Sequence, residues 1–167
     1  MTRAAALLLL ASAPLAGCGL HPLYAGGSAG PVASHLARVE VAPIDGKAGW
    51  LVGNALRDRL AMTPGLAPLY RLEVRLDDKI TGLGVRADDA VTRENRVLRA
   101  RYQLVDLANG TVVLDATAGA DEGLDVVGSE YATIAAENTA LERLSGIVAD
   151  QIVTRLAVQT RRLAAAP

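Results

Sequence analysis

Residues 69–77 read LYRLEVRLD, and this stretch decides the fold. Apolar and charged side chains alternate along it. The apolar set is Tyr70, Leu72, Val74 and Leu76, and the charged set is Arg71, Glu73, Arg75 and Asp77. Strict alternation is the pattern of a β-strand with one buried and one solvent-facing side. The sequence therefore predicts a sheet that is covered on one face only.

Three further stretches alternate in the same way, namely Leu36–Ile44, Val97–Leu107 and Thr111–Ala118. Pro43 should end the first of them at the edge of the sheet, because proline cannot donate a ladder hydrogen bond. Asn109-Gly110 between the last two is a strong hairpin signal. The side chains expected to face the core are Leu98, Ala100, Tyr102, Leu104, Val112, Leu114, Ala116 and Ala118. The less regular stretch 82–89 is interpreted as a long hairpin connection or a bulged strand end.

Two stretches change to a helical period. Lys47–Met62 places Leu51, Val52, Ala55, Leu56 and Leu60 on one broad arc, in which Arg59 is out of place. Ser129 to Arg162 predicts a long helix, with Ser129 as N-cap and basic residues in the last turn. Its apolar stripe is Ile134, Leu141, Leu144, Val148, Ile152 and Leu156.

The order strand, helix, three strands, helix (β-α-β-β-β-α) predicts an α+β fold, a two-layer sandwich of about four strands with two helices packed on one face. The chain has 167 residues, which suits one domain. It is 51% hydrophobic but only 3% aromatic, so the core should be aliphatic. A net charge of −1 argues against a nucleic-acid partner, whose binding domains are usually basic. The single cysteine excludes an intrachain disulfide.

The amino terminus has the features of a secretory signal: Arg3, an apolar run from Ala4 to Ala13, and small residues before Cys18. The apolar run is too short to span a hydrocarbon core about 30 Å thick. Leu15-Ala16-Gly17-Cys18 resembles the lipobox of bacterial lipoproteins, in which the cysteine is acylated and becomes the first residue. We therefore expect a signal peptide at 1–17, a lipidated end and flexible tether at 18–34, and one domain at 35–167.

Residues for catalysis are scarce. His21 lies in the tether and His35 precedes the first strand, and neither belongs to a catalytic motif. Asp77-Asp78 and Asp88-Asp89 have carboxylates that could hold a cation, but paired acids at strand ends are more often turn formers or solvated charges. We expect no catalytic residue, no metal site and no cofactor, and the sequence predicts a protein that is not an enzyme.

Arginine dominates the outward positions of the predicted sheet. Four candidates for binding lie on two strands at alternating positions: Arg71, Arg75, Arg99 and Arg101. Arg38, Arg93 and Arg96 are further candidates for the same patch. The planar guanidinium matches phosphate and carboxylate oxygens, so a polyanionic surface is one interpretation. A merely solvated face is the other, because Glu40, Glu73 and Asp77 share it.

The sequence resembles the LptE family of lipopolysaccharide-assembly lipoproteins. The matching segments are Cys18-Gly19-Leu20-His21-Pro22-Leu23-Tyr24, Gly53–Leu60, Tyr70–Val74, Arg99–Asp106, Tyr131-Ala132, Ala136-Glu137 and Ala140–Leu156, in the family's order. The chain departs from the family in its scarcity of aromatic residues and at Asp121–Gly128, where it has Leu124 in place of an aromatic residue.

The resemblance implies a non-enzymatic lipoprotein of the outer membrane, held by acyl chains such as palmitate on Cys18 and facing the periplasm. Gly19, which is not aspartate, implies the outer membrane as destination. Such proteins plug the LptD barrel, support its folding and bind lipopolysaccharide. Three alternatives stay open: an auxiliary lipoprotein of a lipid-transport ATPase system, a lipid-anchored hydrolase, and a structural lipoprotein that tethers envelope layers.

Overall fold

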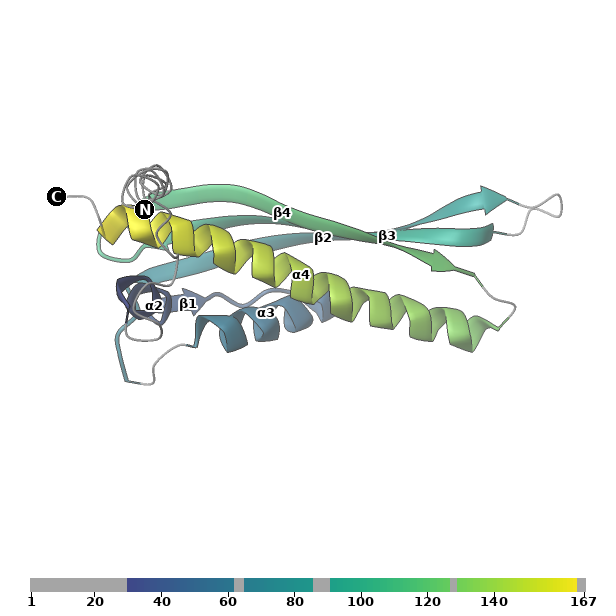
Figure 1. Cartoon of the computed structure of the whole chain (residues 1–167), viewed down its shortest axis with the longest axis horizontal. Coiled ribbons are helices and arrows are strands. Elements are labelled where there is room, and N and C mark those ends of the chain that lie inside the picture. The colour runs from purple at the N-terminus through teal and green to yellow at the C-terminus, as the bar shows by residue number, and fades with distance from the viewer. Residues whose placement is uncertain (1–29, 62–64, 86–90, 127–128, 165–167) are drawn as a thin grey trace, which may run out of the picture.

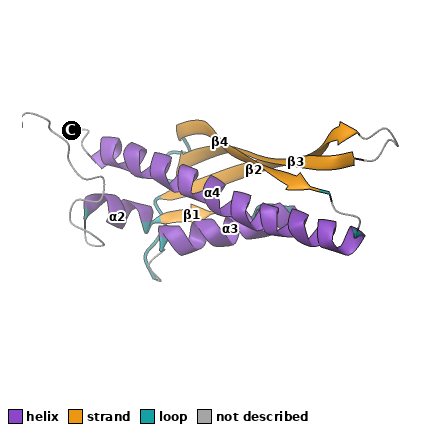
Figure 2. Ribbon diagram, turned by 45° about the vertical axis from the view of Figure 1, so that its right-hand side comes forward, coloured by secondary structure: helices purple, strands orange, loops and turns teal. Residues whose placement is uncertain are grey.

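The computed structural model of the chain describes residues 30–61, 65–85, 91–126 and 129–164. The elements within these ranges are α2 (Pro31–Leu36), β1 (Val39–Val41), α3 (Gly46–Leu60), β2 (Tyr70–Val85), β3 (Val91–Asp106), β4 (Val112–Asp125) and α4 (Glu130–Ala164). The strands form one four-stranded sheet, and α3 and α4 lie together on one side of it (Figure 1). Figure 2 shows the same two layers from another side. The predicted two-layer α+β sandwich is confirmed, with α2 as an additional short helix at its start.

The sheet has the order β1-β2-β3-β4. β1 runs parallel to β2 and pairs only with its first residues, Val39 with Tyr70 and Val41 with Leu72. The other neighbours are antiparallel. β1 ends two residues before Pro43, at the edge of the sheet, as the proline predicts.

The long strands extend further than their alternation predicts. β2 continues to Val85, and Gly82 pairs with Glu94 in regular register. Residues 82–85 of the stretch that we expected to be a connection or bulged end are therefore regular strand, and residues 86–89 lie outside the described residues. β4 likewise continues through Leu124, which is buried. Glycine and polar residues fill these ends, and they hide the alternation on which a strand prediction depends.

The side-chain directions follow the prediction on β2 and β3, where Tyr70, Leu72, Val74 and the four inward residues of β3 are buried. Val112 is an exception, because it is 50% exposed although we expected it in the core. A register shift between Leu104 and Val105 places Val105 opposite Val112 and Leu104 opposite Leu114. An irregularity of this kind breaks the simple alternation at the start of β4.

The two long helices close the core from one side. α3 buries Val52, Leu56 and Leu60. Gly49 lets α3 approach the preceding loop, because a Cβ there would lie 2.4 Å from the carbonyl oxygen of Ile44. α4 buries five residues of its predicted apolar stripe, namely Leu141, Leu144, Val148, Ile152 and Leu156.

Ile134 does not belong to that stripe, contrary to our expectation, and is 47% exposed. The turn of α4 that follows it meets a charged side chain of the sheet, since Arg96 donates a hydrogen bond to the carbonyl of Glu137. The apolar contacts of α4 begin at Ala140.

Packed structure starts earlier than residue 35. Val32 and Leu36 of α2 are each only 4% exposed and belong to the core. Residues 31–34, which we expected to belong to the tether, are therefore part of the helix α2. The expected signal peptide, Cys18 and the stretch 25–29 lie outside the described residues.

Arg59 links the two long helices. Its Nε and Nη2 donate to Asp150 at 2.5 and 3.1 Å, and its Nη1 donates to the carbonyl of Ala55 at 3.0 Å. This explains a charged residue within the apolar arc of α3: the aliphatic stem crosses the helix interface, and the guanidinium binds α4 at the rim.

Candidate functional site

The sheet brings the four predicted arginines to one face. Tyr70, Leu72 and Val74 are buried against the helices, so the odd-numbered residues of β2 face away from them. In the antiparallel register Arg75 lies directly opposite Arg101. β2 and β3 are neighbours, as the prediction required, and the face away from the helices holds Arg71, Arg75, Arg99 and Arg101. We call these four residues the arginine face.

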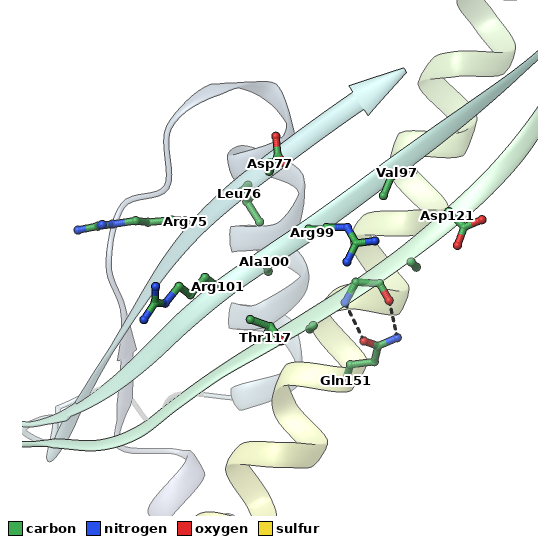
Figure 3. A pocket seen from close by; sticks show the side chains of 13 residues that line it. Arg75, Leu76, Asp77, Val97, Arg99, Ala100, Arg101, Thr117, Asp121 and Gln151 are labelled. Atoms are coloured by element: carbon green, nitrogen blue, oxygen red, sulfur yellow. Dashed lines mark hydrogen bonds between the residues drawn. The ribbon is translucent and has the colours of Figure 1, made fainter. Parts of the chain in front are cut away.

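A hollow of about 540 Å³ lies over the middle of this face. Arg75, Arg99 and Arg101 line it, together with Thr117 and Gln151 among others (Figure 3). The guanidinium groups of Arg75 and Arg101 extend the same way along the sheet, and that of Arg99 extends the opposite way (Figure 3). Arg71 lies beside a different hollow, near the edge strand β1.

The four arginines differ in their partners. Arg71 pairs with Glu40 at 3.7 Å, and Arg101 pairs with Asp115 at 3.1 Å. For Arg75 and Arg99 the described part of the chain provides no ion pair. Like charges directly opposite each other in a sheet repel. The Arg75–Arg101 juxtaposition is therefore a place where a bound anion would lower the electrostatic cost.

The ionisation of Asp115 is favoured by the side chains that surround it. Hydrogen bonds from Arg101 and from Gln103 hold the pKa of the Asp115 carboxyl below its usual value. The same hydrogen bond raises the pKa of Arg101. Both groups are therefore charged at neutral pH.

Small residues and an amide form the β4 side of the hollow. Gly119 lies opposite Arg99, and a Cβ on it would come within 3.4 Å of Arg99 Cγ, so the stem of Arg99 lies across the glycine. The backbone of Gly119 is fixed by Gln151 of α4. Its N–H donates to Gln151 Oε1 at 3.1 Å and its carbonyl accepts from Gln151 Nε2 at 3.2 Å (Figure 3).

Arg96 does not join this patch, contrary to our expectation. It faces the helices, is only 8% exposed and binds Asp78 of β2 at 2.6 and 2.9 Å. Position 96 shares its direction with Leu98 and Ala100, so the alternation itself contained the signal. Arg93 is exposed and pairs with Asp125, whereas Arg38 donates to the carbonyl of Ala67.

Within the described ranges, the other candidate residues for chemistry do not assemble into a reactive group. Asp77 pairs with Lys79, and its neighbour Asp78 points to the opposite face of the sheet. His35 lies in α2 with its ring 6.5 Å from that of Tyr70. Cys18, His21 and Asp88-Asp89 lie outside the described residues. What the arginine face offers is a set of fixed cations, which can bind oxyanions without reacting with them.

No helix in the described ranges is long and apolar enough to cross a membrane. Comparison with curated proteins finds no match. Among solved structures, a protein from Caulobacter crescentus CB15 is similar with a TM-score of 0.63 and 27% identity, over 78% of this chain and 96% of that one.

Two further solved structures share the fold. Rare lipoprotein B from Shewanella oneidensis has a TM-score of 0.59 and 11% identity over 75% of this chain and 98% of its own. A minor lipoprotein from Acinetobacter baumannii has a TM-score of 0.56 and 15% identity over 74% of this chain and 94% of its own. The sequence itself matches the family model LptE, described as lipopolysaccharide-assembly, over residues 36–156. This match spans all the strands, α3 and most of α4, and the chain belongs to the LptE lipopolysaccharide-assembly family.

Proposed function

We propose that this protein is a lipid-anchored outer-membrane lipoprotein that works in lipopolysaccharide assembly without catalysing a reaction. The observation that carries the proposal is the LptE family match over residues 36–156. In this function Cys18 carries the acyl chains, and several chains at about 0.8 kcal/mol per buried methylene hold a protein persistently on a membrane. The folded domain then occupies and supports the LptD barrel from the periplasmic side.

The arginine face suits two surfaces in such a complex. Phosphorylated or acidic sugars of lipopolysaccharide attract guanidinium groups, which bind their oxygens in pairs. The polar lumen of a barrel also presents hydrogen-bonding groups to a protein inside it. Arg75 and Arg99 have no ion pair in the described ranges, and they line a hollow large enough for a ligand group. We assign the lipopolysaccharide contact to the arginine face: Arg75, Arg99 and Arg101 contribute at this hollow, and Arg71 contributes from the neighbouring one.

Partner identification tests the first part of the proposal. The acylated protein is purified by an affinity tag from solubilised outer membranes, and the co-eluting membrane proteins are identified by mass spectrometry. Recovery of LptD is the expected result. Recovery of an inner-membrane transport ATPase without LptD would contradict it and favour an auxiliary role in lipid transport.

Charge reversal tests the second part. Arg99→Glu combined with Arg101→Glu should reduce lipopolysaccharide binding at least tenfold, or reduce recovery of LptD. The matched control is Arg161→Glu with Arg162→Glu, which changes the net charge equally at two exposed positions near the end of α4. Unchanged binding of both ligand and LptD by the Arg99/Arg101 variant would remove the arginine face from the function.

A further inference from the structure

The carboxylate of Asp115 neutralises Arg101, a central cation of the arginine face. Asp115 on β4 lies opposite Gln103 and therefore diagonal to Arg101 across the ladder. Its Oδ2 accepts from Arg101 Nη2 at 3.1 Å and from Gln103 Nε2 at 2.9 Å, and its Oδ1 lies 3.4 Å from Arg101 Nε. The two arginines nearest to Arg101, which are Arg75 and Arg99, have no comparable partner in the described ranges.

The contact uses the donors that a ligand would need. An arginine binds a carboxylate or phosphate best through two parallel N–H groups of its fork. In Arg101 the Nε and Nη2 groups are turned to Asp115. An oxyanion entering between Arg75 and Arg101 would have to take these donors from Asp115 or bind without them.

The contact is also weak enough to exchange. The side chain of Arg101 is 68% exposed and that of Asp115 is 40% exposed. Exposed ion pairs hold their geometry by only a small margin, because water screens the attraction and both side chains lose rotamer freedom. Release of Arg101 requires a change of rotamers and no change of the sheet.

We propose that Asp115 is an internal competitor that sets the affinity of the arginine face for anionic groups. Its carboxylate occupies Arg101 until a phosphate or carboxylate group of the ligand displaces it. This inference rests on the proposed function, in which the ligand is lipopolysaccharide. The hydrogen bonds from Arg101 and Gln103 that lower the pKa of Asp115 keep the competitor ionised at neutral pH.

If Asp115 had a positioning role instead, removing its carboxylate would change the affinity for the ligand in the opposite direction. If the carboxylate oriented Arg101 for the ligand, its removal would weaken binding. If it competes with the ligand, its removal strengthens binding. The sign of the change in affinity therefore separates the two roles.

The test uses Asp115→Asn, which keeps the shape and an oxygen that Gln103 can still donate to. The matched control is Asp125→Asn on the same strand, which removes the same charge from a pair with Arg93 at 3.2 Å. Binding of the full chain in detergent to immobilised lipopolysaccharide is measured for both variants and the wild type. Asp115→Asn should bind about two- to five-fold more tightly than the wild type, as expected from one exposed charge pair, and the control should bind like the wild type.

Further arms identify the anion and separate the two proposals. Lipopolysaccharide stripped of phosphate should lose the gain if phosphate is the competing group, and should keep it if a sugar carboxylate is. If Asp115→Asn binds intact lipopolysaccharide no better than the control, the proposed role of Asp115 as competitor is overturned, while the proposed function of the protein stands. If no form of the protein binds lipopolysaccharide, the proposed ligand fails. Titration with inorganic pyrophosphate, followed by the NMR signal of Arg101 Nε–H, then tests the competition by Asp115 without lipopolysaccharide. Equal affinities of Asp115→Asn and Asp125→Asn for pyrophosphate would overturn it.

Discussion

Two adjacent aspartates on β2 have opposite surroundings. Asp77 faces away from the helices and pairs with Lys79, and both side chains are more than half exposed. Asp78 faces α4 and binds Arg96, whose side chain is only 10% exposed. Arg96 also donates to the carbonyl of Glu137 at 2.8 Å, so one guanidinium joins two strands and a helix. The hydrogen bonds that Arg96 donates to Asp78 raise the pKa of Arg96.

Removing the Asp78 carboxylate should destabilise the fold markedly. Asp78→Ala leaves a buried cation without its counter-ion, and loss of one partner of a buried pair costs about 3–5 kcal/mol. Because Asp78 is a quarter exposed, we expect about 2–3 kcal/mol. Urea unfolding measures the change in the free energy of unfolding.

Asp77→Ala is the matched control for that measurement, because it removes an aspartate from the next position. Its pair with Lys79 is solvent-exposed, and the loss should stay within about 0.5 kcal/mol. Equal losses in the two variants would show that Arg96 finds sufficient solvation without Asp78.

The inward direction of Arg96 can be predicted from the sequence, but its partner Asp78 cannot. Extending the alternation of β3 backwards from Leu98 already turns Arg96 inward, yet arginine is so rarely buried that its residue type alone favours an exposed position. Its burial depends on Asp78, which lies on another strand, and only the register of β2 on β3 brings the two together. A pairing between distant residues of this kind is invisible in a single sequence.

At the scale of elements, α4 fastens the free edge of the sheet. An edge strand exposes unpaired N–H and C=O groups that can pair with other chains. On β4 the side chain of Gln151 binds both backbone groups of Gly119, and Gln159 Nε2 donates to the carbonyl of Val113 at 2.9 Å. The helix thus covers parts of the edge with its own amides.

Gln151→Leu should free the amide of Gly119. Its hydrogen exchange should become at least tenfold faster, since the N–H loses its acceptor at 3.1 Å. Exchange measured by NMR provides an internal control in Ala118 and Ala120, whose backbone groups point to β3 by alternation and should exchange as before. Equal acceleration at all three positions would indicate general loosening of β4 instead.

The contact between α3 and α4 should show a defined pH dependence. The hydrogen bond from Arg59 holds the pKa of Asp150 below its usual value. A lowered pKa in the folded state means that the contribution to stability is present above the unfolded value of about 3.9 and is lost as the pH falls through the folded value.

Asp150→Asn should therefore be less stable than the wild type at pH 7, by no more than about 1 kcal/mol, because the Asp150 side chain is 65% exposed. Thermal unfolding at decreasing pH should show this gap closing below pH 4. A gap that is the same at pH 7 and at the lowest pH would mean that the ionised Asp150–Arg59 pair does not carry it.

The identities of the elements could be predicted because alternation and helical period are local. Their ends could not. Val112 is exposed beside the register shift at Leu104 and Val105, and Ile134 is exposed because the core contacts of α4 begin only at Ala140. α2 was missed because it is short and follows a glycine-rich stretch, and it is helical in contact with α4. Each of these departures is decided by tertiary contacts and not by the local pattern.

For the whole molecule, the sequence predicted which arginines share a face but not which of them are neutralised. That difference depends on Glu40 and Asp115, which come from other strands and reach Arg71 and Arg101 only in the folded sheet. The hollow beside Arg99 likewise depends on Gly119, which has no side chain to fill it. This use of a glycine becomes visible only when β4 is aligned with β3. A candidate binding face could be predicted, whereas its charge balance required the structure.

In the proposed function, acyl chains on Cys18 hold the domain at the membrane without contributing to its fold. The first side chain of the core in the described ranges is Val32, well beyond Cys18, so acylation should add nothing to the packing. A version in which residues 1–18 are replaced by a secretory signal that is cleaved without acylation should melt at the same temperature. It should also move from the membrane to the soluble periplasmic fraction. Recovery of LptD should fall several-fold without vanishing, because the anchor raises local concentration while the domain supplies the contacts. Mass spectrometry must find acyl chains on Cys18 of the natural form. An unmodified thiol there, or membrane retention of the altered form, would show that something other than lipid holds the domain in place.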